Sequence, residues 1–349
     1  MKKTGKDFVD DGYPAFGAGG INGFVNEYER DEDAVILSSN GARCGKCFLA
    51  FGKWTSLANT TVIIPDPNIA DAKFLWYQLN DEKRWVKYGT GQPFIRPSMV
   101  KTHLVELPSI VEQKRIVAIL DKANGIKESS KKTKEIHEKL ISSLFHEMFG
   151  DTRLNPNSYM VKELREVVSE GTTVTYGIVQ AGPEVENGVP YIRTKDISNG
   201  KIQGKNLRHT DPEIARKFER SMVREGDLVI SIRATVGTIA MTPSSLDGAN
   251  LTQGTARISP GDSVTGDFLL WHIRSQGSQQ WISQQIKGVT FKEITLTRLR
   301  TLPVMIPPLK LQNLFTQYVE HINSLFEKIE DANNLSSTKS KAITQEMLS

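Results

Sequence analysis

The chain has little or none of several features that mark familiar classes of protein. It has only two cysteines among 349 residues, Cys44 and Cys47, which excludes a disulfide framework and agrees with a reducing compartment. It has no apolar run of about 18 residues, the length needed to cross a membrane. Its first residues, M-K-K-T-G-K-D-F, lack the apolar stretch of a signal peptide. We therefore expect a cytoplasmic protein.

Signatures of DNA-modifying and nucleotide-using enzymes are also missing. Residues 155–159, N-P-N-S-Y, lack the second proline of an adenine-methyltransferase motif, and we interpret them as a turn. Residues 65–66 and 71–73 contain the letters of a magnesium nuclease motif, but with the wrong spacing. No Walker loop is present, so we expect no ATP site in this chain. The six histidines are scattered, which does not favour a metal centre.

No strong excess of one charge is present either. The net charge is +4, and residues 1–108 hold 13 basic and 13 acidic side chains, whereas residues 151–308 hold 19 and 16. Such regions do not bind nucleic acid through charge alone. If the protein holds DNA, local clusters or a partner must neutralise much of the phosphate charge.

A repeat with a period of 199 residues is present instead. Residues 107–126 match residues 306–325, with Pro108 opposite Pro307 and Gln113 opposite Gln312. Each segment predicts a helix that begins just after its proline and lasts about 40 residues, or roughly 60 Å. We therefore predict two long helices of similar length.

Apolar residues in the two segments recur with spacings of three and four, which is typical of a helical seam. The alternative is a pair of amphipathic helices within one ordinary core. We predict that the helices pair through Ile116, Ile119, Ala123 and Ile126 in the first and Phe315, Tyr318, Ile322 and Leu325 in the second.

The regions before the helices also correspond. D-A-V-I-L-S-S-N-G-A-R-C-G (residues 33–45) matches G-D-L-V-I-S-I-R-A-T-V-G (residues 226–237), each an apolar strand followed by a polar loop. Further matches are residues 57–65 with 251–260, short helices from Phe74 and Phe268, and loops at 89–96 and 287–294. The predicted domains are a globular region at 1–108, a long helix at 109–150, a second globular region at 151–308 and a second helix at 309–349.

These motifs resemble the specificity (S) subunit of type I restriction–modification systems. The resemblance rests on Y-P-A-F-G-A-G-G-I-N-G-F (residues 13–24), S-S-N-G-A-R-C-G and L-P-S-I-V-E-Q-K-R-I-V in the first half. The second half adds G-V-P-Y-I-R-T-K-D-I (residues 188–197), G-D-L-V-I-S-I-R-A-T-V-G and N-L-T-Q-G-T-A-R-I. Together the motifs cover nearly the whole chain, in the same order twice.

The resemblance implies an α+β fold, in which two mixed α/β target-recognition domains alternate with two long antiparallel coiled-coil helices in a pseudo-twofold repeat. Each domain would read one half of a split double-stranded DNA target. The helices would set the spacing and dock two methyltransferase subunits and, we expect, restriction subunits. The chain itself would be non-catalytic, with S-adenosylmethionine, ATP and magnesium held by partners. Family members usually have a short segment before the first recognition domain, so we expect that domain to be shortened at its N-terminus.

Side chains that can read bases sit in or beside loops rich in glycine and threonine. The candidate DNA-binding residues are Lys6, Tyr13, Asn40, Arg43, Gln92, Arg96, Tyr176, Arg193, Lys195, Arg233, Asn250, Gln253 and Lys292. Arg43 and Arg233 are preferred, because both follow a strand at corresponding places in the two repeats. Asn250 and Gln253 have an alternative role in satisfying backbone groups of a turn.

Two other functions fit parts of the sequence. One is the recognition part of a fused methyltransferase–endonuclease, and the other is a protein-interaction module built on paired helices. The C-x-x-C pair also has two chemical readings, zinc or redox. Its counterparts in the second copy are Val236 and Ile239, so we predict that Cys44 and Cys47 only fill space in a core.

Overall fold

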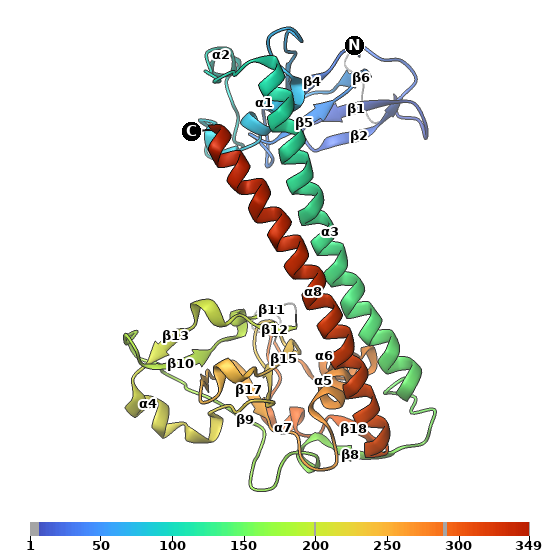
Figure 1. The fold of residues 1–349 in the computed structure, drawn as a ribbon, viewed down its shortest axis with the longest axis vertical. Helices are drawn as coiled ribbons and strands as arrows, with labels where there is room; N and C mark the ends of the chain where they lie inside the picture. Colours follow the sequence, from blue (N-terminus) through green and yellow to red (C-terminus); the bar gives the residue numbers. More distant parts are fainter. Residues whose placement is uncertain (1–6, 199, 289–291, 349) are drawn as a thin grey trace. The chain divides into compact units, whose positions relative to one another are not determined.

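The computed structural model describes residues 7–198, 200–288 and 292–348, with residues 334–348 described by their backbone alone. The chain forms two compact units: unit 1 comprises residues 1–130 and 331–349, and unit 2 comprises residues 131–330. The element order is a globular part, a long helix, a second globular part and a second long helix (Figure 1). The predicted α+β class is confirmed. The expected shortening of the first domain concerns residues outside the described ranges.

Unit 1 contains two small sheets. One has the order β2-β1-β6-β3, and the other has the order β5-β4-β7. The strands are β1 (Tyr13–Gly17), β2 (Gly20–Val25), β3 (Arg30–Asp31), β4 (Ala34–Ser38), β5 (Cys47–Ala50), β6 (Lys53–Ser56) and β7 (Thr60–Ile63). The helices are α1 (Ala72–Leu79), α2 (Pro97–Lys101) and the first part of α3 (Ile110–Phe149). Every residue of β4 is buried, because this apolar strand lies in the centre of its sheet.

Unit 2 repeats this plan with additional elements. Its strands are β8 (Met160–Glu163), β9 (Thr175–Tyr176), β10 (Val189–Ile192), β11 (Ile197–Ser198), β12 (Lys201–Ile202), β13 (Arg208–Thr210), β14 (Leu228–Ser231), β15 (Ile239–Met241), β16 (Asn250–Leu251), β17 (Thr255–Ile258) and β18 (Pro303–Ile306). Its helices are α4 (Pro212–Lys217), α5 (Gly266–Arg274), α6 (Gln276–Gln285), α7 (Leu296–Leu299) and most of α8 (Leu309–Leu348). The main sheet has the order β15-β14-β17-β9.

The central strands of the two units have the same neighbours in the same register. In unit 1, β4 lies between β5 and β7, with Ser38 opposite Thr60. In unit 2, β14 lies between β15 and β17, with Ser231 opposite Thr255. Ser38 and Ser231 therefore occupy equivalent positions, at the point where each central strand ends.

A buried glutamine joins each long helix to its own unit through three equivalent hydrogen bonds. Gln113 accepts from the backbone N–H of Asp71 (2.8 Å) and donates to the carbonyls of Ile69 and Pro108 (both 2.9 Å). Gln312 accepts from the N–H of Thr265 (2.9 Å) and donates to the carbonyls of Ser263 (3.1 Å) and Pro307 (2.8 Å). Both side chains are fully buried. We call each arrangement a glutamine clamp.

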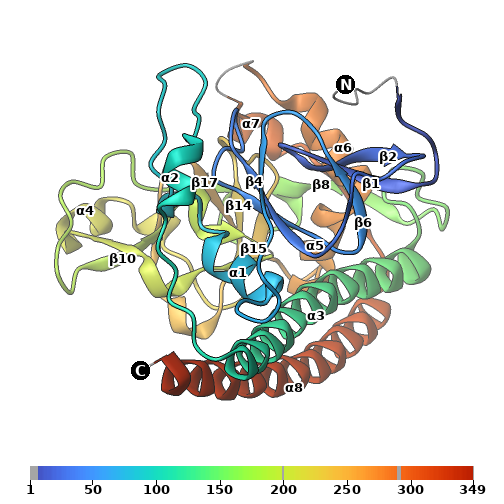
Figure 2. The same ribbon diagram turned by 90° about the horizontal axis from the view of Figure 1, so that it is seen from above.

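The two long helices each contain 40 residues, as predicted. Within unit 2 they run antiparallel and side by side (Figures 1 and 2). Lys134 forms an ion pair with Glu330 (2.9 Å), and the Phe145 ring contacts the Phe315 ring. Later residues of α3 therefore lie beside earlier residues of α8, as antiparallel helices require. No described helix is long and apolar enough to cross a membrane.

The predicted seam is correct for some residues of α8 and wrong for others. Phe315 is buried and Ile322 packs against the same core, but Tyr318 and Leu325 are 45% and 46% exposed. Val319, which is buried, and Phe326, whose ring contacts the His137 ring, take the inward positions instead. The seam therefore follows a spacing of four, three and four from Phe315 and leaves Tyr318 and Leu325 on the outer flank.

The predicted seam of α3 belongs to unit 1. Ile116 is buried, and Ile119, Ala123 and Ile126 are half-buried along one stripe. Pairing of these residues with α8 stays a prediction, since the side chains of residues 334–348 lie outside the described part.

Candidate nucleic-acid interface

The loop after β14 is held tightly by backbone and hydroxyl hydrogen bonds. The Gly237 N–H donates to the Ser231 carbonyl (2.9 Å), which closes the loop. The Ser231 hydroxyl donates to the Arg233 carbonyl (2.8 Å). On the other side, the Ala234 N–H donates to the Lys292 carbonyl and the Ile294 N–H donates to the Ile232 carbonyl, both at 3.0 Å. Arg233 is therefore fixed opposite Glu293 in an antiparallel bridge.

The loop after β4 in unit 1 has the same closure. The Gly45 N–H donates to the Ser38 carbonyl (2.8 Å), as Gly237 does to Ser231. The Gly41 N–H donates to the Pro93 carbonyl and the Ile95 N–H donates to the Ser39 carbonyl, both at 2.9 Å. Asn40 is therefore fixed opposite Phe94 in an antiparallel bridge.

This pattern corrects the predicted correspondence between Arg43 and Arg233. Asn40 occupies the position equivalent to Arg233. Asn40 bridges Phe94, which precedes Ile95, and Arg233 bridges Glu293, which precedes the equivalent Ile294. The Lys46 N–H donates to the Arg43 carbonyl (3.0 Å), as the Thr238 N–H does to Thr235 (3.1 Å). Arg43 thus corresponds to Thr235, and the unit 1 loop is one residue longer. Its guanidinium donates to the Gly19 carbonyl (2.7 Å) while the side chain stays exposed.

In both loops, the residue after the bridged one has a left-handed backbone conformation. Gly41 has φ of +94° and its counterpart Ala234 has φ of +58°. A residue with a side chain rarely adopts this conformation, which costs about 1 kcal/mol or more. The bonds on both sides of Ala234 hold it there, and the turn leaves Arg233, Ala234 and Thr235 exposed.

Further segments converge on the Arg233 loop in unit 2. The Ile178 N–H donates to the Leu251 carbonyl (2.7 Å), and the Gln253 N–H donates to the Ile178 carbonyl (2.9 Å). A side chain on Gly177 would collide with the Leu251 carbonyl, so glycine is required for this approach. The Ile232 N–H donates to the Gly254 carbonyl (2.8 Å), which joins these segments to the loop. Residues 176–178, 232–235, 252–254 and 292–294 thus form one group, which we call the unit 2 loop cluster.

Three segments of this cluster have equivalents in unit 1, namely residues 39–43, 57–59 and 92–94. Residues 17–19 complete the unit 1 group but correspond to residues 193–195, because the Leu57 N–H donates to the Phe16 carbonyl as the Thr252 N–H does to the Ile192 carbonyl (3.2 Å). The Ser39 N–H donates to the Asn59 carbonyl and the Leu57 N–H donates to the Phe16 carbonyl, at 2.9 and 2.8 Å. The amide of Gln92 lies about 4 Å from the position that a side chain on Gly41 would take. We call this group the unit 1 loop cluster.

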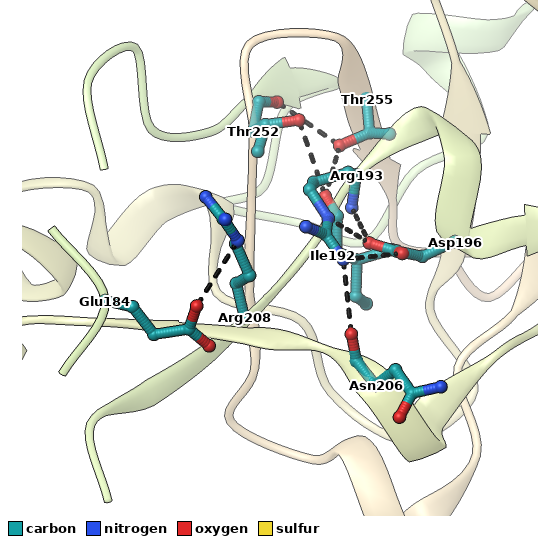
Figure 3. Close-up of polar contacts among 8 residues, drawn as sticks. All are labelled: Glu184, Ile192, Arg193, Asp196, Asn206, Arg208, Thr252 and Thr255. Carbon is teal, nitrogen blue, oxygen red and sulfur yellow. Dashed lines mark hydrogen bonds and ion pairs between the residues drawn. The ribbon is translucent and has the colours of Figure 1, made fainter. Parts of the chain in front are cut away.

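Arg193 has a structural role next to the unit 2 loop cluster. Its Nε and Nη2 donate to the two carboxylate oxygens of Asp196 (2.7 and 2.9 Å), and Nη2 also donates to the Asn206 carbonyl (3.2 Å), as Figure 3 shows. The ion pair raises the pKa of Arg193, chiefly through the hydrogen bonds that the guanidinium donates to Asp196. The adjacent Ile192 carbonyl accepts from the Thr255 hydroxyl (3.2 Å). Nε and Nη2 of Arg193 are therefore used inside the fold, and contact of Arg193 with DNA stays a prediction.

Asn250 was predicted to contact DNA, and this prediction is wrong. Its side chain is fully buried, and its amide group donates to the Ala215 carbonyl (3.1 Å) while its oxygen accepts from Ser221 (2.6 Å). An amide that is satisfied within the core cannot reach a base. Asn250 instead connects β16 to the end of α4.

The other predicted residues lie as follows. Asn40, Tyr13 and Gln253 are half-buried, and Arg43, Gln92, Arg96, Tyr176, Lys195, Arg233 and Lys292 are exposed. Arg96 stacks over the Tyr88 ring (4.2 Å), and Tyr13 packs edge-on against Tyr28 (4.9 Å). Lys6 lies outside the described residues. The contact of any of these side chains with DNA stays a prediction.

The cysteines fill space in a core, as predicted. Cys44 and Cys47 are both buried within the apolar cluster of unit 1. Burial raises the pKa of the Cys47 thiol to about 12, so it is neither a ready nucleophile nor a ready metal ligand. Within the described part of the chain, no three His, Cys, Asp or Glu side chains come together as a metal site.

Glu293 and Ser231 are two site residues that sequence reasoning missed. Glu293 pairs with Arg233 (Nε to Oε2, 3.2 Å), and Ser231 holds the Arg233 backbone. The sequence did place F-K-E-I in a segment matched between the repeats. The carboxylate became significant only when the bridge placed it opposite an arginine.

The chain is thus a duplicated α+β protein with one loop cluster in each of its two units. The chain matches the family model of the type I restriction modification DNA specificity domain over residues 2–138 and 156–344, and it belongs to that family. The resemblance seen in the sequence is confirmed.

Curated relatives and solved structures agree with this family. The chain is 26% identical over 250 residues to the specificity subunit of the type I restriction enzyme EcoBI from Escherichia coli, and 23% identical over 315 residues to that of MjaVIII from Methanocaldococcus jannaschii. These matches cover 71% and 85% of this chain, but 51% and 74% of the relatives, so the chain spans about half the length of the first.

The fold is similar to that of a type I restriction–modification S subunit from M. genitalium. That comparison has a TM-score of 0.62 and 17% identity, and covers 99% of this chain and 91% of the other. A chain from a structure described as showing complex assembly and conformational transition of the type I R-M system has a TM-score of 0.52 and 18% identity, covering 90% and 80%. At these identities the likeness concerns the fold.

Proposed function

We infer that this chain is the DNA-specificity subunit of a type I restriction–modification complex, and that each unit reads one half of a bipartite target. The observation that carries this is the equivalence of the two loop clusters. Both are built by the same backbone bonds around the end of a central strand, yet their exposed side chains differ. A common backbone framework that carries different exposed side chains is suited to reading two different half-sites.

The flanks of the two helices within unit 2 support docking of a partner subunit. Glu138 on α3 and Thr316 on α8 face the globular part, through contacts with Arg274 (3.5 Å) and Thr265 (3.4 Å). At about 100° per residue, large apolar side chains lie roughly opposite to them on the outer flanks. These exposed residues are Ile136, Leu140, Leu314, Tyr318, Leu325 and Ile329. Such a surface favours a protein partner, which we take to be the methyltransferase subunits, with restriction subunits joining the complex.

The chain acts by positioning its partners and performs no chemical step. In this proposal S-adenosylmethionine, ATP and magnesium are bound by the partner subunits. The chain supplies the loops that hold the DNA and the helices that set the distance between half-sites. About one helical turn of B-DNA, roughly 34 Å, separates half-sites read from one face.

Methylation of a random DNA library tests the proposal. The chain with its methyltransferase subunits and S-adenosylmethionine should methylate a gapped, two-part sequence, whereas the chain alone should transfer no methyl group. Methyl transfer by the chain alone would instead make it a fused enzyme. Methylation without sequence preference would contradict the recognition function itself.

The docking surface has a separate test. The double variant Tyr318→Glu and Leu325→Glu should abolish co-purification with the methyltransferase subunits, because two carboxylates would be buried in an apolar interface. Glu327→Lys, on the opposite flank of α8, should leave co-purification unchanged. Equal binding by the double variant and the parent chain would rule out this flank as the docking site.

A further inference from the structure

Arg233 and Glu293 form an ion pair whose geometry leaves one edge of the guanidinium available. The contact runs from Nε of Arg233 to Oε2 of Glu293 at 3.2 Å, and the side chains are 47% and 45% exposed. Among the described residues, none accepts a hydrogen bond from the two terminal nitrogens of Arg233. Those nitrogens form the fork with which arginine binds a ligand through two parallel hydrogen bonds.

The backbone fixes both members of the pair before any ligand arrives. Residues that oppose each other in an antiparallel bridge carry their side chains on the same face. The bridge between Arg233 and Glu293 is held at both ends by the bonds of Ala234 and Ile294. The Ser231 hydroxyl adds a third restraint at the Arg233 carbonyl. A long, flexible side chain that is held in one orientation loses less entropy on binding.

Unit 1 shows that this ion pair is not part of the repeated framework. The equivalent bridge joins Asn40 to Phe94, which carries no charge. The Ser38 hydroxyl, equivalent to that of Ser231, is buried without a hydrogen-bond partner among the described atoms. The same fold is therefore made without the arginine, the carboxylate or the hydroxyl restraint. The repeated framework does not require the additional groups of unit 2, which leaves them available for another role.

The chemistry of a restrained arginine fork suits a ligand with two neighbouring acceptors. In the major groove, guanine presents two acceptors, O6 and N7, at the spacing of the two terminal guanidinium nitrogens. We propose that Arg233 reads a guanine in the half-site of unit 2 and that Glu293 is the positioning residue that orients its guanidinium. This rests on the function proposed above.

Selection from a randomised double-stranded DNA library tests the proposal, using the full chain with its methyltransferase subunits. Arg233→Ala identifies the base pair that Arg233 reads, where guanine preference should fall by about tenfold to a hundredfold. Glu293→Ala should reduce guanine preference at the same base pair by about tenfold and leave the other positions unchanged. Glu293→Gln, which keeps an oxygen acceptor for Nε–H, should restore most of that preference.

The chain offers a matched control in the same unit. Arg208 and Glu184 pair through the same atoms at 3.3 Å with similar exposure (Figure 3), so Glu184→Ala removes a comparable ion pair and should leave every base preference unchanged. A purely structural role for Glu293 would lower overall affinity without changing the preference at one base pair.

Two results would overturn the proposal while leaving the proposed function intact. One is unchanged guanine preference in Glu293→Ala, and the other is a position identified by Arg233→Ala that prefers a base pair without guanine. A parent complex with no sequence preference would contradict the proposed function instead.

Discussion

The two units attach α1 and α5 to the long helices through the same glutamine clamp, but the pair of charged residues beside the clamp differs. In unit 1, Lys73 forms an ion pair with Asp121 (2.6 Å), which also accepts from the Tyr77 hydroxyl (2.8 Å). In unit 2, the equivalent residues are Asp267 and Glu320, both acidic. Burial raises the pKa of Asp267, and the nearby carboxylate of Glu320 raises it further, although a hydrogen bond from Thr316 opposes both effects.

A second difference lies one turn further along the same helix. His272 in α5 is fully buried, accepts from the Met305 N–H through Nε2 (3.1 Å) and contacts the Ser278 hydroxyl through Nδ1 (3.2 Å). Its counterpart in α1 is Gln78, which has no charge to gain. The comparison teaches that the repeat conserves backbone bonding while the ionisable groups around it are free to change. Removal of its clamp should therefore lower the stability of either unit by a similar amount. A change of pH should change the stability of the two units by different amounts.

The largest effect is expected from removing the clamps. Gln113→Ala and Gln312→Ala each remove three hydrogen bonds to backbone groups, most of them partly buried, so each variant should lose about 3 kcal/mol of stability. Hydrogen exchange should show the loss in unit 1 for the first and in unit 2 for the second. Gln317→Ala, an exposed glutamine on the same helix as Gln312, serves as the control. Unequal losses of stability in the two units would contradict the equivalence of the two glutamine clamps.

A smaller effect is expected from acid, and only in unit 2. Burial lowers the pKa of His272 to about 3 from its usual 6.5. A histidine with a lowered folded pKa contributes stability that is complete above pH 6.5 and is lost as the pH falls toward 3. Between pH 7 and pH 5 the loss should be about 2 kcal/mol.

Urea unfolding followed by hydrogen exchange at the two pH values measures this loss. His272→Gln, which copies unit 1, should flatten the pH dependence of unit 2. An equal acid loss in the parent chain and in His272→Gln would remove His272 as its cause.

The smallest effect is expected at the charges beside the clamps. Because the folded pKa of Asp267 is raised, its stabilising contribution is present below its ordinary value and is lost as the pH rises through the raised value. At pH 7, Asp267→Asn should therefore stabilise unit 2. Lys73→Met should destabilise unit 1 by about 0.5 kcal/mol, as is usual for a partly exposed ion pair. Thermal unfolding at pH 7 measures both shifts, and shifts of the same sign would contradict the opposite roles assigned to these charges.

The sequence predicted the parts of the fold that rest on periodicity and on matched residues. The long helices, the paired glutamines and the packing of the cysteines all follow from such patterns. The sequence could not show whether Tyr318 or Val319, and Leu325 or Phe326, faces inward. In each pair both residues are largely apolar, and spacings of three and four are equally regular along a helix. Only the position of the globular part decides which flank faces inward.

The loops were harder to predict, because a match of letters is not a match of backbone bonds. Arg43 and Arg233 both follow similar strands in the sequence, but one additional residue in the first loop places Asn40 at the position equivalent to Arg233. Asn250 was misassigned for a related reason. An asparagine whose buried amide hydrogen-bonds to α4 has the same letter in the sequence as an asparagine whose exposed amide contacts a base.

Target mapping of two single variants tests the central claim, that the two units are equivalent readers of two half-sites. Asn40→Ala and Arg233→Ala change equivalent positions in the two loop clusters, and methylation sequencing of each complex reports its DNA target. We expect each variant to relax base preference in one half of a gapped target, a different half for each, with the spacer unchanged. A single continuous target, or loss of preference in the same half for both variants, would contradict the claim.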